Sequence, residues 1–236
     1  MALPKIEHPT FKVTLPSSKS LITLRPFLVR EEKILLMALQ SEDSEEVINS
    51  IKQVINNCIF EENINVDDLA TIDIEYLFIK LRARSVNNII KLTYKDNEDE
   101  KRYDVEVNLD EVEVKYSDEH TNDIKINEEI GIKLKYPNAS LSNQVKDAKT
   151  ETELFFKILK NSLDVIYDKN NEYKVSDSSE EEVEEFIHSL DVKAFNKIQS
   201  FFTTMPRLHY EVSYVNSLGK NRTITLNSLS DFFTLG

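Results

Sequence analysis

The stretch DIEYLFIKLRARSVNNIIKLTY, residues 73–94, contains the change of hydrophobic period that decides the fold class. In its first part the apolar side chains recur at the three- and four-residue spacing of one helix face, at Ile74, Leu77, Phe78 and Leu81. In its second part the segment IIKLTY is short, apolar and rich in residues that favour strands. A helix that gives way directly to strands indicates an α+β protein.

Three further segments after residue 94 keep the two-residue period. RYDVEVNL at 102–109 alternates apolar with charged or amide side chains, and the polar link KDNEDEK separates it from the first strand. VEVKY at 112–116 resumes the alternation after a one-residue slip that suggests a bulge, and IGIKLKY at 130–136 adds another strand. These segments predict a small central antiparallel sheet with one wet, acidic face. Its hairpin is expected to face solvent as a module separable from the helical body.

Helical patterns lie on both sides of this sheet in the sequence. The apolar stripe from Val47 to Ile59 predicts an amphipathic helix that carries Cys58 as a small core residue. TETELFFKILKNSLDVIY at 150–167 predicts another helix, and the polar segment that follows it is expected to be a loop. A long helical pattern then runs until Pro206 stops it, and Asp191 is expected to cap a break within it.

The remaining elements complete an α+β architecture. They are a hairpin at 11–24, a helix from residue 29, a hairpin at 208–226 and a short helix at 227–233. The prediction is a helical body with an N-terminal β-hairpin, a central small antiparallel β-sheet and a C-terminal β-hairpin. The corresponding segments are 1–87, 88–137 and 138–236.

Charge is distributed unevenly along the chain, whose net charge is −13. Residues 1–40 carry six Lys/Arg against three Asp/Glu, and residues 192–236 carry five against two, so the acidic excess lies between these segments. Most of these carboxylates are expected on solvated faces. Because an acidic surface repels phosphate backbones, no nucleic acid is expected as a partner. The expected partners are basic surfaces of other proteins, with both chain ends as docking faces.

The residue types that catalysis and metal binding use do not occur at recognisable spacings. Glycine occurs only at positions 131, 219 and 236, which excludes the common glycine-rich nucleotide motifs and the GxSxG nucleophile elbow. The histidines at 8, 120, 188 and 209 show no zinc-ligand spacing. We therefore predict no catalytic residue, no cofactor and no metal site. An enzyme that holds a divalent metal with its many carboxylates is an alternative from another class.

No apolar run approaches the ~20 residues that a transmembrane helix needs. The longest is ILLMAL at 34–39. MALPKIEHPT lacks the pattern of a secretory signal, and Cys58 has no partner for a disulfide within the chain. These features predict no membrane span and a reducing, cytoplasmic site of synthesis.

Two Phe-Phe pairs near the end of the chain are the strongest candidates for partner contacts. Phe201-Phe202 ends the long helical pattern, and Phe232-Phe233 follows the last hairpin. One interpretation is that all four rings meet in one terminal core. The other is that one ring of each pair faces outward, because adjacent side chains on a helix diverge by about 100°. In that case the outward rings, with Met205 and Arg207, form a patch that contacts a partner.

Four separated blocks carry a family resemblance over most of the chain. They are SLITLRPFLVREEKILLMALQS (20–41), DIEYLFIKLRARSV (73–86), DEVEVKYSDEHTNDIKINEEIGIKLKYP (110–137) and FNKIQSFFTTMPRLHYEVSYVNSLGKNRTITLNSLSDFF (195–233). In this order they resemble the T4-like bacteriophage base plate protein family. The resemblance implies a non-enzymatic role in assembling the baseplate hub of contractile-tailed phages, with other phage baseplate or hub proteins as partners.

The resemblance also implies a location in the host cytoplasm during assembly, or in the virion at the tail baseplate. It leaves open whether the protein is a structural subunit or a chaperone, and it does not give the oligomeric state. Some members of the family have cysteines near the central hairpin that could make a zinc knuckle. LTYKDNEDEKRYDVEV at 92–107 has none, so no metal is carried over to this chain. A host adaptor or regulatory module is the alternative function.

Overall fold

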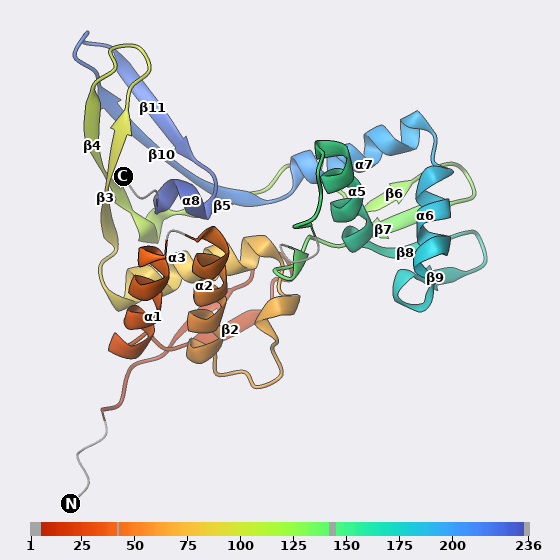
Figure 1. Ribbon diagram of the computed structural model, residues 1–236, viewed down its shortest axis with the longest axis horizontal. Helices are drawn as coiled ribbons and strands as arrows, with labels where there is room; N and C mark the ends of the chain where they lie inside the picture. The colour runs from red at the N-terminus through yellow and green to blue at the C-terminus, as the bar shows by residue number, and fades with distance from the viewer. Residues whose placement is uncertain (1–5, 42, 142–144, 234–236) are drawn as a thin grey trace, which may run out of the picture. The chain divides into compact units, whose positions relative to one another are not determined.

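The computed structural model describes residues 6–41, 43–141 and 145–233 (Figure 1). Helices and small antiparallel sheets occur along the whole described chain, which confirms the predicted α+β class.

The chain forms two compact units whose boundaries differ from the three predicted segments. Residues 1–115 and 207–236 make up unit 1, and residues 116–206 make up unit 2. The predicted segments followed sequence order. Unit 1 instead combines both ends of the chain, because a strand near residue 114 pairs with a strand that starts at residue 207.

Unit 1 contains two hairpins, a three-stranded sheet and a group of helices. Its elements before the crossing into unit 2 are β1 (Phe11–Thr14), β2 (Leu21–Leu24), α1 (Val29–Gln40), α2 (Ser44–Cys58), a 3-10 turn (Val66–Asp68), α3 (Thr71–Ser85), β3 (Ile89–Lys95), β4 (Arg102–Asn108), a 3-10 turn (Leu109–Glu111) and β5 (Glu113–Lys115). Its elements after the return are β10 (Arg207–Val215), β11 (Asn221–Leu226) and α8 (Leu229–Phe232).

Helix α3 contributes more buried side chains than the other described helices of unit 1. The sequence pattern predicted one apolar face, but Ile72 and Ile79 are buried as well, so more than one face of the helix is covered. Leu77, Ile79 and Leu81 are fully buried. Cys58 is also buried at the end of α2, as its place on the apolar stripe predicted.

The predicted central sheet does not exist as one sheet. Strands β3 and β4 form a separate hairpin, β5 pairs with β10, and the strand near residue 132 belongs to unit 2. The expected bulge after β4 is a 3-10 turn. The ammonium group of Lys80 donates to the carbonyl oxygens of Leu109 (3.3 Å), Asp110 (3.0 Å) and Val112 (3.1 Å), so it holds this turn against α3.

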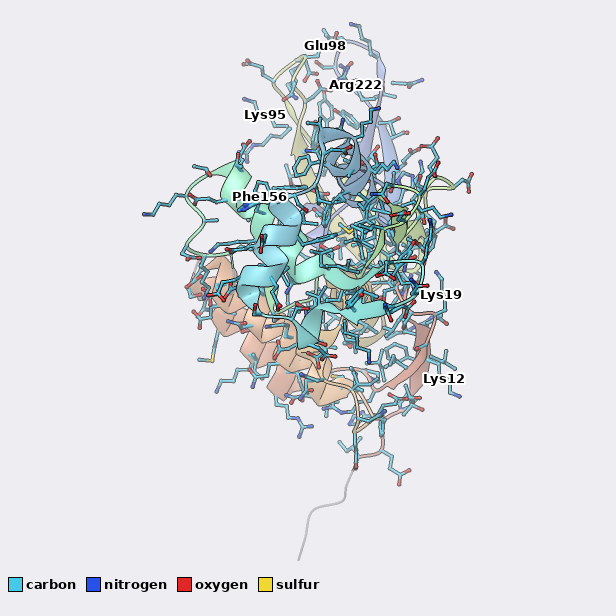
Figure 2. All side chains as sticks on the ribbon, turned by 90° about the vertical axis from the view of Figure 1, so that its right-hand side faces the viewer. Lys12, Lys19, Lys95, Glu98, Phe156 and Arg222 are labelled. Atoms are coloured by element: carbon cyan, nitrogen blue, oxygen red, sulfur yellow. The ribbon has the colours of Figure 1, made fainter. Side chains whose placement is uncertain are left out.

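The link between β3 and β4 is packed against the C-terminal hairpin, so the prediction of a separable, solvent-facing module is wrong. Asp96 is fully buried and accepts a hydrogen bond of 2.6 Å from the hydroxyl of Tyr214. The backbone N–H of Ser217 donates to Asp99 at 3.0 Å. Arg222 approaches Glu98 to 3.3 Å (Figure 2). Residues of the C-terminal hairpin, about 120 positions later in the sequence, therefore bind the acidic side chains of this polar link.

Over its described residues, unit 2 contains a four-stranded antiparallel sheet and the helices α5, α6 and α7. Its elements are β6 (Asp123–Lys125), β7 (Gly131–Leu134), α5 (Glu151–Ser162), β8 (Leu163–Tyr167), β9 (Glu172–Lys174), a 3-10 turn (Val175–Asp177), α6 (Glu180–His188) and α7 (Val192–Thr204). The strand order is β6-β7-β8-β9. The core of this unit joins Ile132 of the sheet to Leu159 of α5, Ile187 of α6 and Ile198 of α7.

Two predictions for unit 2 are corrected by this topology. The helix expected over 150–167 ends at Ser162, and LDVIY continues as strand β8. The polar segment after it, expected to be a loop, includes strand β9, which pairs with β8. Local periodicity did not reveal these strands because each is stabilised by pairing with another strand of the sheet and not by a pattern within its own sequence.

The break in the long helical pattern is confirmed. Helices α6 and α7 are separate, and the carboxylate of Asp191 caps α7 by accepting a hydrogen bond of 2.7 Å from the backbone N–H of Ala194. The short C-terminal helix is present as α8. Over the described part of the chain, no helix has both the length and the apolar character that crossing a membrane requires.

Candidate docking surface

Four phenylalanine rings on α5 and α7 form a cluster at the surface of unit 2. We call Phe155, Phe156, Phe195 and Phe202 the aromatic surface. The ring of Phe155 lies 5.2 Å from that of Phe195 and 5.6 Å from that of Phe202, in both cases edge to face. Phe156 lies 5.9 Å from Phe195. Each of the four side chains is partly buried, and Phe155, Phe156 and Phe202 pack against the unit 2 core, so the cluster presents only its outer edge to solvent.

The positions of these rings follow from helix geometry. Phe195 and Phe202 are seven residues apart, about two turns, so they lie on the same face of α7. Thr150 caps α5 by accepting from the backbone N–H of Glu153 at 3.1 Å, which fixes the start of the helix before the Phe155-Phe156 pair. Val192, at the start of α7, adds apolar side-chain area that is 74% exposed.

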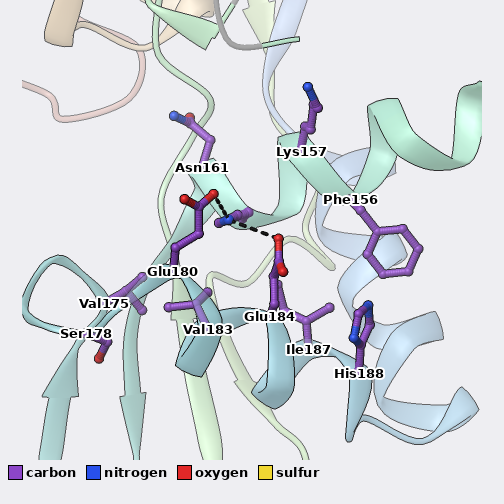
Figure 3. Close-up of a pocket in the computed structure, with 11 residues that line it drawn as sticks. Phe156, Lys157, Asn161, Val175, Ser178, Glu180, Val183, Glu184, Ile187 and His188 are labelled. Atoms are coloured by element: carbon purple, nitrogen blue, oxygen red, sulfur yellow. Dashed lines mark hydrogen bonds and ion pairs between the residues drawn. The ribbon is translucent and has the colours of Figure 1, made fainter. Parts of the chain in front are cut away.

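An open groove of about 690 Å³ lies beside the aromatic surface, between α5 and α6 (Figure 3). We call it the α5–α6 groove. Its apolar lining is Phe156, Val175, Val183 and Ile187, and its polar lining is Lys157, Lys160, Asn161, Ser178, Glu180, Glu184 and His188. The rings of Phe156 and His188 meet edge to face at 6.2 Å, so Phe156 belongs to both the groove and the aromatic surface.

The polar side of the groove is organised by one lysine. Lys160 on α5 forms ion pairs with Glu180 and with Glu184, the latter at 3.3 Å, and both carboxylates lie on α6. Partial burial lowers the pKa of Lys160, but these bonds more than offset it and the pKa is raised overall. The same contact lowers the pKa of Glu180. The carboxylate of Glu180 therefore stays ionised at neutral pH.

The predicted contact residues are divided between the two units. Phe201 is buried in unit 2, where its ring lies 5.0 Å from that of His120 and 5.1 Å from that of Phe202. Phe202 is half-buried, and half-buried Met205 packs against the same core.

The other three predicted residues belong to unit 1. Phe232 is 1% exposed, and half-buried Phe233 contacts Phe78 edge to face at 5.4 Å. Arg207 is exposed at the start of β10. In each Phe-Phe pair, then, one ring is buried and the other keeps some exposure. The two pairs pack in the cores of different units.

Sequence reasoning missed Phe155, Phe156 and Phe195 as surface residues. A signal existed, because Phe155-Phe156 is a third Phe-Phe pair. It was not recognised because Phe155 also fits the apolar stripe of α5, and a stripe residue is normally assigned to the core.

A family model described as T4 bacteriophage base plate protein matches residues 8–234. This protein belongs to that family. The match includes most of unit 1 and all of unit 2, and it confirms the resemblance seen in the four sequence blocks. As a member of the family, the chain is a bacteriophage baseplate protein, a class that forms part of the virion tail. No curated protein and no solved structure matches this baseplate protein.

The described residues contain no group of three or more His, Cys, Asp or Glu side chains placed to hold a metal ion. Cys58 is buried, and burial raises the pKa of its thiol to about 11. At neutral pH it is therefore a protonated core residue of the baseplate protein.

Proposed function

We propose that this baseplate protein acts in assembly of the baseplate hub by docking onto other baseplate proteins, and that it does so without catalysing a reaction. The observation that carries the proposal is the aromatic surface of unit 2. Apolar clusters that reach the surface of a protein mark interaction sites, and phenylalanine is enriched in the buried centres of protein interfaces. Docking would take place in the host cytoplasm as the hub assembles.

The residues predicted from the sequence keep a place in this proposal. Phe202 in unit 2 and Phe233 in unit 1 retain some exposed area and are proposed anchors, each within its own unit. Met205 in unit 2 and Arg207 in unit 1 are further proposed contacts. Phe201 and Phe232 are proposed to support these anchors from the cores of their units. The aromatic surface extends the Phe202 contact across α7 to α5.

A pull-down from infected cells tests the proposal. Phe195→Ala should strongly reduce recovery of baseplate proteins, because truncation of an interface anchor costs 2 kcal/mol or more, about 30-fold in Kd. Phe60→Ala is the matched control, since this ring is 56% exposed in unit 1 outside the aromatic surface. Equal recovery with both variants, or no baseplate protein with the wild-type chain, would contradict the proposal.

Mass spectrometry of purified virions addresses the remaining part of the proposal. A chain found in both virions and lysate is a structural subunit of the hub. A chain found with baseplate proteins only in the lysate is an assembly factor that leaves before the particle is complete.

A further inference from the structure

The α5–α6 groove combines an apolar floor with an acidic wall. Val183 and Ile187 on its floor are part of the unit 2 core, so the groove is open down to the apolar interior of the unit. Its volume, about 690 Å³, is within the ~300–1,000 Å³ of typical binding clefts. It has room for more than one side chain of a partner.

The acidic wall is the exposed side of α6. Residues 172–191 contain eight Asp/Glu and one Lys, the densest negative charge in unit 2. Glu180 and Glu184 are four residues apart, so both lie along the groove (Figure 3). Glu181 and Glu185 are exposed on the same helix and do not line the groove. This field attracts cations and repels phosphate-rich or acidic partners.

The Lys160 ion pairs show which chemistry the wall accepts. A lysine of the chain reaches from α5 to α6, and its ammonium group is bound by the carboxylates of Glu180 and Glu184. Each carboxylate has about four acceptor positions, so a second cation can bind beside Lys160 without displacing it. The two glutamates are 78% and 58% exposed, so a partner can reach them from solvent.

We propose that the α5–α6 groove binds a cationic, apolar segment of another baseplate protein. An aliphatic or aromatic side chain of that segment enters between Phe156 and Ile187, and a neighbouring Lys or Arg pairs with Glu180 and Glu184. The inference rests on the proposed docking function and names the chemistry of one partner. The edge-to-face contact of Phe156 with His188 makes the groove continuous with the aromatic surface, so one partner can cover both.

A binding titration with the full-length protein tests the charge and the shape of the groove. The probe is a fluorescent helical peptide made of Leu and Lys, and its counterpart has Glu in place of Lys. Glu184→Gln should weaken binding of the Leu/Lys peptide by about 3- to 10-fold, while Glu185→Gln, with the same change in net charge on the same helix, should change it by less than about twofold. Ser178→Trp should obstruct the groove and weaken binding by about tenfold or more. The inference would be overturned if the two Glu variants had equal effects or if both peptides bound equally. It would also be overturned if Ser178→Trp had no effect in a protein that still folds.

Site-specific photocrosslinking in infected cells identifies the natural occupant. A crosslinker at Ser178 should capture peptides of another baseplate protein that carry Lys or Arg beside an apolar side chain. Capture of a second copy of this chain, of acidic segments, or of no baseplate protein would overturn the inference. A crosslinker at Val192, beside the aromatic surface, separates the two proposals: baseplate proteins captured there but not at Ser178 refute the groove and leave the docking function standing. No capture at either position refutes both.

Discussion

Replacing Phe201 with alanine should destabilise unit 2 far more than the same change at Phe202. Phe201 is 2% exposed and its ring contacts those of His120, Tyr136 and Phe202 at 5.0–5.8 Å. Burial of a phenylalanine side chain is worth roughly 1.5–3 kcal/mol, and the cavity left by its removal raises the total cost to about 3–5 kcal/mol. Phe202 packs against the same core but opens to solvent, so its truncation leaves no closed cavity and loses only the larger part of the transfer term, about 1–2 kcal/mol.

The measurement must resolve the two compact units, because regions of a protein can differ in local stability. Urea unfolding followed by circular dichroism gives the total effect, and hydrogen exchange read by mass spectrometry locates it. Exchange should accelerate in residues 116–206 of Phe201→Ala and change little in unit 1. The reasoning fails if Phe202→Ala costs as much as Phe201→Ala, or if exchange increases equally in both units.

Four further predictions follow from particular contacts. Replacing Lys95–Lys101 with a Gly/Ser turn should lower the melting temperature, since this link is bonded to the C-terminal hairpin; an unchanged melting curve would show that those bonds contribute nothing. Burial lowers the pKa of His120, so its contribution to stability is present above pH ~6.5 and is lost as pH falls through the folded-state pKa. His120→Gln should therefore make the melting temperature depend less on pH between pH 8 and 5, and an unaltered pH dependence would contradict this. A Cβ at Gly131 would overlap the ring of Tyr167, so Gly131→Ala should cost about 1–3 kcal/mol in urea unfolding, and a neutral result would mean that the ring moves freely. Joining Lys115 to Arg207 by a short turn, which removes unit 2, should leave a folded unit 1 with a cooperative melt, and an unfolded product would show that the units depend on each other.

The predicted elements that proved correct have signals contained within the element itself. The apolar spacing of α2 and α3, the alternation in β4 and the capping carboxylate of Asp191 are each set by residues close together in the sequence. Such patterns report which face of an element is buried, so they located the helices and hairpins. They do not report which distant element provides the covering surface.

The errors share one physical cause, which is stabilisation by residues far away in the sequence. LDVIY follows α5 without a break and is a strand because β7 and β9 pair with it on either side. Asp96 is buried in a link that looks solvated, because the hydroxyl of Tyr214 reaches it from 118 residues away. The candidate site was found only in part for a related reason. Phe202 could be singled out as one of an adjacent pair, but its contact with Phe155 of α5 depends on how the helices of unit 2 pack.

The pairing of β5 with β10 connects this topology to the proposed role. Lys115, the last residue before unit 2, lies opposite Arg207, the first residue after it, so the chain leaves and re-enters unit 1 at neighbouring positions of one sheet. An inserted unit with adjacent ends can change its own surface without disturbing the core that carries it. The aromatic surface and the α5–α6 groove both lie entirely within this insertion. If partners bind these proposed surfaces, recognition can change through residues of α5, α6 and α7 while the core of unit 1 stays the same.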